Sequence, residues 1–187
     1  MAILSPRSTV LTVALMALTG TALGAPAAPP PPSVNEVKAA FLCSFAEFVE
    51  WPGTANQGPV TIGILGKDPF GPLLEETAKV RALQTKALEI RRLTRMEEAA
   101  RFRIVYVSAS EAPRLDQVLR SLEGASVLTV SDIPRFAARG GVIGFVLEGR
   151  RVRFEINVAA AERSGLQISS RLLNLARSVQ GAPKSGA

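Results

Sequence analysis

Histidine is absent from the 187 residues, and Cys43 is the single cysteine. Without histidine the chain has no Ser-His-Asp or Cys-His catalysis, no histidine general base, no His-ligated zinc and no haem with a proximal histidine. One cysteine cannot supply an intramolecular disulfide, an iron–sulfur cluster or a thiolate zinc site. We therefore expect neither a metal site nor an organic cofactor.

Aromatic residues are also scarce, at 5% of the chain, whereas 22 Lys and Arg against 16 Asp and Glu give a formal charge of +6. The arginines cluster in two segments, residues 91–103 and 150–153. Both clusters lack the interleaved aromatic side chains of a stacking platform, so no nucleic-acid partner is expected. They fit solvated surface or, as the sharper alternative, a face that binds an acidic protein.

The first 24 residues have the pattern of an export signal. Arg7 is the only charge before Glu36, residues 10–18 are apolar except for Thr12, and small residues surround a cleavage point after Gly24. An uncleaved anchor is the alternative, but the apolar run is shorter than the ~20 residues of a spanning helix. We predict a cleaved signal peptide (1–24), an Ala/Pro-rich spacer (25–32), one folded domain (33–180) and a disordered tail (181–187).

Helix and strand signals alternate through the predicted domain. Ser33 and Glu36 form a capping box before apolar residues at spacings of three and four, which predicts a helix from Ser33 to about Glu50. Strands are expected at 60–65, 87–91, 103–107, 127–130, 142–147 and 151–157. Further helices are expected after the Asp68-Pro69 pair, at 95–101, from the Ser108–Glu111 box to 122, at 134–138, at 158–164 and at 169–179.

This order predicts an α/β fold, a layered sandwich with a mainly parallel sheet and a C-terminal antiparallel hairpin flanked by helices. Residues 151–157 alternate strictly, so Val152, Phe154 and Ile156 should face inward. The outward polar row is either ordinary solvent surface or a recognition face, and we predict that it binds a partner. Its members are Arg151, Arg153, Glu155 and Asn157.

A glycine-flanked turn at residues 66–71 follows one predicted strand and precedes a helix. Pro72 follows its second glycine where a Walker loop needs lysine, and the glycine spacing does not fit a dinucleotide fingerprint. A turn with a helix cap is the main interpretation, and a small anion held at strand ends is the alternative. Four residues would then bind the ligand: Gly66, Asp68, Ser131 and Asp132.

Residues for catalysis are lacking. Adjacent carboxylates at 75–76 and 97–98 point in two directions on their helices, and the serines have no histidine to activate them. We therefore predict that the chain is not an enzyme. Cys43 lies in a helix that is apolar nearly all round, so we expect it to be buried and inert.

Six segments, in order, resemble the YfiR-like family of periplasmic proteins: KAAFLCSFAEFVEWP, GKDPFG, VYVSASE, VLTVSD, RFAARGG and VRFEINVAAAERSGLQISSRLLNLAR. The resemblance extends from about Glu36 to Val179. It implies a periplasmic regulator, often a homodimer, that binds the periplasmic sensor region of an inner-membrane diguanylate cyclase and represses it. Cyclic di-GMP and biofilm formation would then fall, and an outer-membrane peptidoglycan-binding lipoprotein would be a second partner.

The sequence departs from that family at two places. Cys43-Ser44 stands where relatives commonly have Tyr-Asn, and Phe102-Arg103 stands where they have Cys-His, so control by an internal disulfide is not available. A periplasmic module that binds a small anionic ligand stays open as the alternative function.

Overall fold

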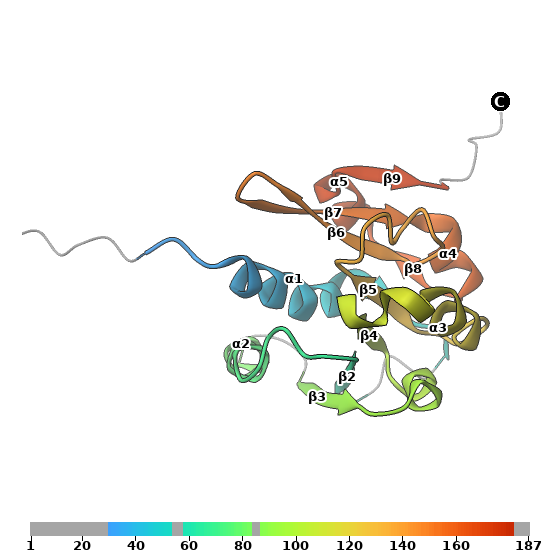
Figure 1. The fold of residues 1–187 in the computed structure, drawn as a ribbon, viewed down its shortest axis with the longest axis horizontal. Helices are drawn as coiled ribbons and strands as arrows, with labels where there is room; N and C mark the ends of the chain where they lie inside the picture. The colour runs from blue at the N-terminus through green and yellow to red at the C-terminus, as the bar shows by residue number, and fades with distance from the viewer. Residues whose placement is uncertain (1–29, 54–57, 84–86, 182–187) are drawn as a thin grey trace, which may run out of the picture. The chain divides into compact units, whose positions relative to one another are not determined.

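The computed structural model describes residues 30–53, 58–83 and 87–181, and the compact unit discussed below begins at Pro32 (Figure 1). The predicted signal peptide, most of the spacer and the tail beyond residue 181 lie outside the described residues. None of the helices within these ranges is long and apolar enough to cross a membrane.

The first helix, α1 (Val34–Phe48), begins with the predicted capping box. Ser33 Oγ accepts the Glu36 backbone N–H at 3.2 Å, and Glu36 accepts the Ser33 N–H in return. The helix ends earlier than predicted because β1 (Val49–Glu50) pairs antiparallel with β8 (Gln167–Ile168). Cys43 is buried, as predicted, and burial raises its pKa to about 11.

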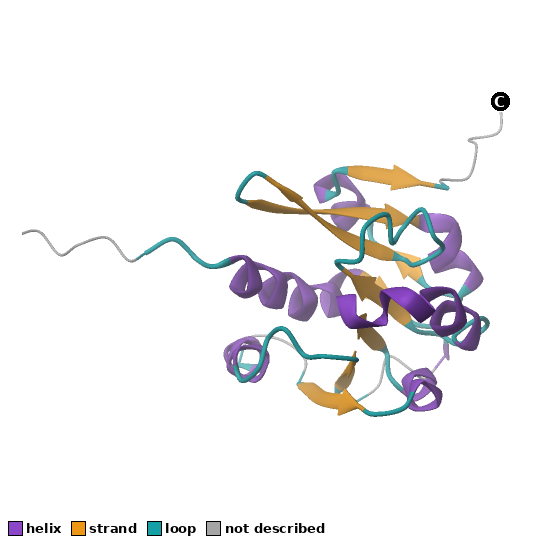
Figure 2. Cartoon of the chain, viewed as in Figure 1, coloured by secondary structure: helices purple, strands orange, loops and turns teal. Residues whose placement is uncertain are grey.

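Seven strands form the main sheet, in the order β3-β2-β4-β5-β6-β7-β9. Figure 2 shows the strands in orange, with helices beside them. Every neighbouring pair is parallel except the β6–β7 hairpin, which is antiparallel. The predicted α/β fold class is therefore confirmed. The strands are β2 (Val60–Leu65), β3 (Leu88–Leu93), β4 (Ile104–Val107), β5 (Leu128–Ser131), β6 (Ile143–Glu148), β7 (Arg151–Asn157) and β9 (Ser178–Gln180).

Two apolar clusters lie on opposite faces of this sheet. Strand β4 shows the alternation, since Ile104 and Tyr106 join the cluster with α1 whereas Val105 and Val107 join the cluster with α3. The remaining helical segments are α2 (Leu73–Ala82), η2 (Met96–Arg101), η3 (Ala109–Arg114), α3 (Leu115–Ser121), α4 (Val158–Arg163) and α5 (Ser170–Leu175).

The helix predicted at 134–138 is wrong, because residues 133–140 form successive turns instead. Arg135 adopts φ 61°, in the left-handed region, which a right-handed helix cannot include. The Gly141 N–H donates to the Phe136 carbonyl at 3.1 Å and closes the segment.

The final predicted helix, at 169–179, is also wrong in its second half. Helix α5 ends at Leu175, and Ala176 is extended at φ −67° and ψ 146°. The Arg177 N–H then donates to the Phe154 carbonyl at 2.8 Å, and β9 pairs with β7. Leu175 and Val179 are four residues apart and would share one face of the predicted helix, but they are 57% and 38% exposed.

Candidate functional site

Three parallel strands end side by side at one edge of the sheet. Leu65 at the end of β2 is in register with Val107 of β4, which is in register with Ser131 of β5. Between β2 and β4 the chain order reverses, because β3 lies on the other side of β2. Ligands of open α/β sheets bind outside the carboxyl ends of the strands at such a position. The structure thus brings the four predicted ligand residues to the expected edge.

Gly66 follows β2 with φ 91°, which favours glycine. A Cβ atom here would lie 2.5 Å from Ser110 Oγ and 2.8 Å from the Glu111 carboxylate, so the η3 segment covers this position closely. Ser110 Oγ also accepts the Lys67 N–H at 2.9 Å. The backbone after β2 is therefore held against η3.

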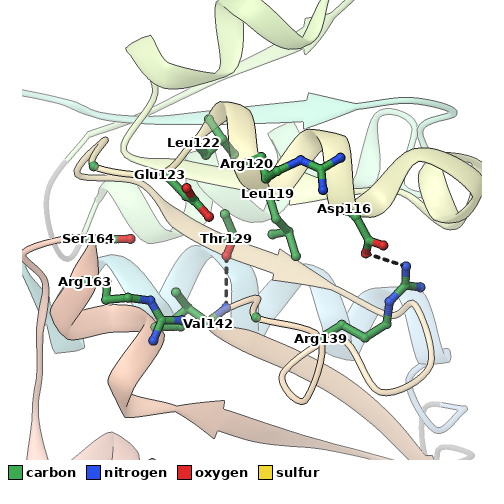
Figure 3. Close-up of a pocket in the computed structure, with 13 residues that line it drawn as sticks. Asp116, Leu119, Arg120, Leu122, Glu123, Thr129, Arg139, Val142, Arg163 and Ser164 are labelled. Carbon is green, nitrogen blue, oxygen red and sulfur yellow. Dashed lines mark hydrogen bonds and ion pairs between the residues drawn. The ribbon is translucent and has the colours of Figure 1, made fainter.

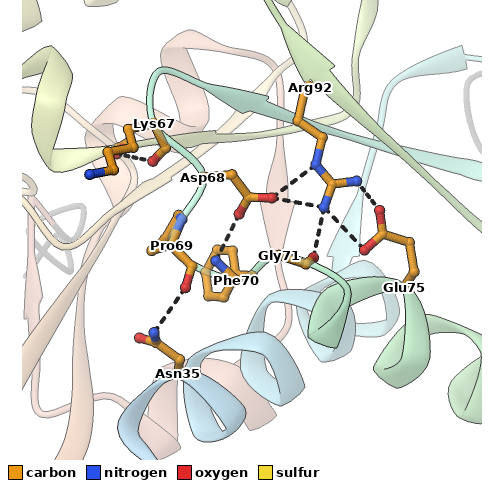
Figure 4. Close-up of polar contacts among 9 residues, drawn as sticks. Asn35, Lys67, Asp68, Pro69, Phe70, Gly71, Glu75 and Arg92 are labelled. Carbon is orange, nitrogen blue, oxygen red and sulfur yellow. Dashed lines mark hydrogen bonds and ion pairs between the residues drawn. The ribbon is translucent and has the colours of Figure 1, made fainter.

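Asp68 anchors the turn that follows β2 (Figure 4). Its Oδ1 accepts the Phe70 N–H at 2.8 Å, and its Oδ2 lies 2.7 Å from Arg92 Nη2. The same guanidinium also binds the Gly71 carbonyl and Glu75. The expectation that Asp68 caps the next helix is wrong, because α2 begins later, at Leu73, after Pro72 and without a side-chain cap.

Ser131 is fully buried at the end of β5. Its hydroxyl donates to the Val107 carbonyl at 2.6 Å and accepts the Ile133 N–H at 3.0 Å. Similarly, Ser108 caps no helix: its hydroxyl donates to the Lys67 carbonyl at 2.6 Å. These serines therefore connect strand ends to the loops beside them.

Asp132 forms an ion pair with Lys38 of α1, with 2.6 Å between Oδ2 and Nζ. Only 13% of the Lys38 side chain and 24% of the Asp132 side chain are exposed. The Asp132 Oδ1 atom and the Tyr106 hydroxyl are buried, and neither has a hydrogen-bond partner in the described structure. Burial, and secondly the Asp132 carboxylate, raise the pKa of Tyr106, so this hydroxyl stays protonated.

These contacts bear on the predicted anion site. The backbone N–H groups of Lys67, Phe70 and Ile133 already donate to side chains of the chain itself. Asp68 and Asp132 would repel an anion. Anion binding at this edge stays a prediction, and the contacts favour a structural role for the four residues.

The predicted recognition row on β7 divides into two halves. Arg151 and Arg153 are exposed, and neither side chain makes a hydrogen bond or ion pair with a described residue. Glu155 lies 3.2 Å from Arg177, whereas Asn157 accepts the Ala160 N–H at 2.9 Å as the N-cap of α4. The first two side chains are free for a partner, and the last two hold the domain together.

Sequence reasoning missed a cavity of about 530 Å³ between α3, the segment just before β6, and α4 (Figure 3). The Arg139–Asp116 ion pair, at 2.8 Å, lies at one end of it. Glu123 and Arg163 line the other end, and neither side chain has a hydrogen-bond or ion-pair partner among the described residues. No local pattern signals this cavity, because its walls come from segments far apart in the sequence.

Acidic and cysteine side chains can bind a metal ion only where several of them lie close together. Within residues 30–53, 58–83 and 87–181, no three of them gather as a metal site would require. The carboxylates near the strand ends are instead paired with Lys38 and Arg92.

Two solved structures share the fold at low sequence identity. A conserved domain protein from Vibrio cholerae O1 biovar El Tor matches with a TM-score of 0.57 and 13% identity over 79% of this chain. The ABC domain in complex with L-Trp from Streptococcus pneumoniae matches with a TM-score of 0.55 and 16% identity over 75% of this chain. The match covers 60% of the length of each of those proteins.

The family comparison covers most of the described domain. The model described as YfiR/HmsC-like matches residues 35–177, from the first turn of α1 to the residue before β9. This range includes the strand-end turns and the β6–β7 hairpin. The chain therefore belongs to the YfiR/HmsC-like family.

Proposed function

We propose that this protein is an exported, non-enzymatic regulator that binds the periplasmic sensor region of an inner-membrane diguanylate cyclase and represses it. Family membership supports the regulatory role. We place the binding surface on β7 because of Arg151 and Arg153. Both side chains are exposed, and neither has an ion-pair partner on the described structure. Free guanidinium groups on a rigid strand suit an acidic protein face.

Repression by binding requires only a difference in affinity. If the regulator binds the inactive conformer of the cyclase more tightly than the active one, the population shifts toward the inactive state. A second periplasmic partner, such as a peptidoglycan-binding lipoprotein of the outer membrane, would relieve repression by capturing the regulator. No bond is made or broken in this mechanism.

The test compares two double charge reversals of equal size. Arg151→Glu with Arg153→Glu should abolish recovery of the sensor domain in a pull-down and raise cyclic di-GMP to the level of a deletion strain. The control, Lys79→Glu with Arg101→Glu, changes the charge equally on exposed, unpaired side chains of α2 and η2. Unchanged cyclic di-GMP in the deletion strain would contradict the proposal, and equal binding by both variants would move the interface elsewhere.

A second candidate function, binding of a small ligand, is favoured by the cavity beside α3 and α4. Its volume of about 530 Å³ is in the range of small-molecule sites, and Glu123 and Arg163 offer opposite charges without partners. Thermal-shift screening with phosphates, nucleotides and carboxylates would test it, since a ligand should raise the Tm in a concentration-dependent way. The Arg163→Ala variant should lose that shift.

A further inference from the structure

The sheet ends at β3, whose outer backbone groups have no strand beside them in the described structure (Figure 1). The Val60 N–H donates to the Ala87 carbonyl at 2.9 Å. This bond shows which residues of β3 turn their backbone groups toward β2. In a parallel pair, every second residue then turns both its N–H and its C=O toward the neighbour. Leu88, Ile90 and Arg92 therefore turn these groups away from β2.

The side chains of β3 are divided between two faces. Leu88 and Ile90 pack against the cluster that includes α1, and Leu93 belongs to the opposite cluster. Because strand side chains alternate, Glu89 and Arg91 lie on the same face as Leu93. Both are exposed, and neither has an ion-pair partner among the described residues.

Arg92 is different from Arg91, since Asp68 and Glu75 hold it on the α2 side of the strand. Those two carboxylates are thus occupied and do not draw Arg91 away from its own face. A shallow hollow lined by residues 89–92 runs along the strand and leaves its edge accessible.

We propose that β3 is the surface through which two copies of this chain form the homodimer that the family resemblance implies: their β3 strands pair antiparallel, with Ile90 opposite Ile90. This register matches the backbone, because the residues that turn outward become the hydrogen-bonded pairs: Ile90 with Ile90, and Leu88 with Arg92. It also matches the charges. Glu89 of each copy is opposite Arg91 of the other, in the non-hydrogen-bonded pairs where side chains approach most closely.

A self-complementary edge explains why the face of β3 that bears Leu93 carries one charge of each sign two residues apart. The arrangement is isologous, so it closes at two copies and leaves no further β3 edge to extend. It rests on the geometry of β3 alone and does not depend on the proposed repression.

A charge-swap experiment tests the register. Sedimentation velocity of the protein purified from periplasmic extracts should show a dimer. Glu89→Arg or Arg91→Glu alone places like charges opposite each other twice, and should weaken dimerisation roughly 10- to 100-fold. The double variant E89R/R91E exchanges the two charges, so that residues of opposite charge again face each other at both positions. It should restore a dissociation constant within about threefold of the native value.

Two matched controls carry the same charge changes away from β3. Glu162→Arg on α4 and Arg101→Glu at the end of η2 alter exposed, unpaired side chains and should leave the dimer intact. A monomeric native protein, single reversals that leave the dimer unchanged, or a double variant that stays monomeric would each overturn the proposal.

Hydrogen exchange on the unaltered protein gives an independent readout. The outward amides of Ile90 and Arg92 should exchange slowly at concentrations that favour the dimer and rapidly on dilution, while the inward amide of Arg91 stays protected throughout. Exchange of Ile90 that is equally fast at both concentrations would rule out pairing through β3.

Discussion

Lys38 of α1 and Asp132 after β5 form an ion pair of 2.6 Å between groups 94 residues apart in the sequence. The pair fastens the first helix to the end of the sheet at which three parallel strands terminate. Both side chains are mostly buried, and the second carboxylate oxygen lies in a buried position without a hydrogen bond. Removing either partner leaves the other charge without compensation.

The first prediction concerns this pair. Lys38→Met should lower the free energy of unfolding at pH 7 by about 2–3 kcal/mol, because a largely buried carboxylate loses its counter-charge. The double variant K38M/D132N should recover part of that loss, since no unpaired charge remains. Urea denaturation of the single and double variants measures the coupling, and losses that simply add would contradict it.

The second prediction concerns the alkaline stability of the protein and the titration of Tyr106, which is the only tyrosine in the chain. Burial, with the Asp132 and Asp68 carboxylates, raises its pKa above the ordinary value of 10.0. The folded state therefore retains this proton at pH values where the unfolded state has lost it. Its contribution to stability is complete below pH 10 and declines above it, by about 1.4 kcal/mol per pH unit.

Absorbance of tyrosinate reads this single group directly. It should rise together with unfolding in alkali, rather than near pH 10 in the folded protein. Tyr106→Phe should make the alkaline decline in unfolding free energy shallower by the contribution of that one proton. A folded protein that shows tyrosinate absorbance at pH 10 would disprove the interpretation.

The third prediction concerns Gly66, where two constraints coincide. Gly66→Ala should cost about 2–4 kcal/mol, because φ is positive and the new Cβ would meet Ser110 and Glu111 at less than 3 Å. Gly149→Ala is the matched control: its φ is also positive, at 58°, but no atom lies within 4 Å of a Cβ there. That change should cost only about 1 kcal/mol. Equal costs in thermal unfolding would show that crowding at Gly66 is unimportant.

An element of this fold could be predicted from the sequence where the contacts that form it join neighbouring residues, and not where they join distant segments. The start of α1 was predictable because Ser33 and Glu36 bond to each other within one turn. The strand β9 was not, because the predicted helix at 169–179 is broken by long-range pairing with β7, which begins with the bond from the Arg177 N–H to the Phe154 carbonyl, 23 residues earlier. Long-range pairing there overrides local propensity.

The candidate site follows the same rule. The pattern of alternation predicted that Arg151 and Arg153 face outward, because facing depends only on neighbouring residues of one strand. It could not show that Arg177 would bind Glu155, or that Lys38 would reach Asp132. The one local hint was Lys38 itself, the single basic residue of an otherwise largely apolar helix.

The fourth prediction separates the two halves of the β7 row. Asn157→Ala should lower stability by about 1 kcal/mol, because α4 loses its N-cap, and should leave partner binding unchanged. Arg153→Glu should do the reverse, weakening partner binding while the unfolding free energy stays within about 0.5 kcal/mol of the native value, as for exposed positions without contacts. Urea denaturation and sensor-domain pull-down on the same preparations measure both effects. If Asn157→Ala weakens binding more than Arg153→Glu does, recognition takes place at the α4 end of the strand rather than near the hairpin turn.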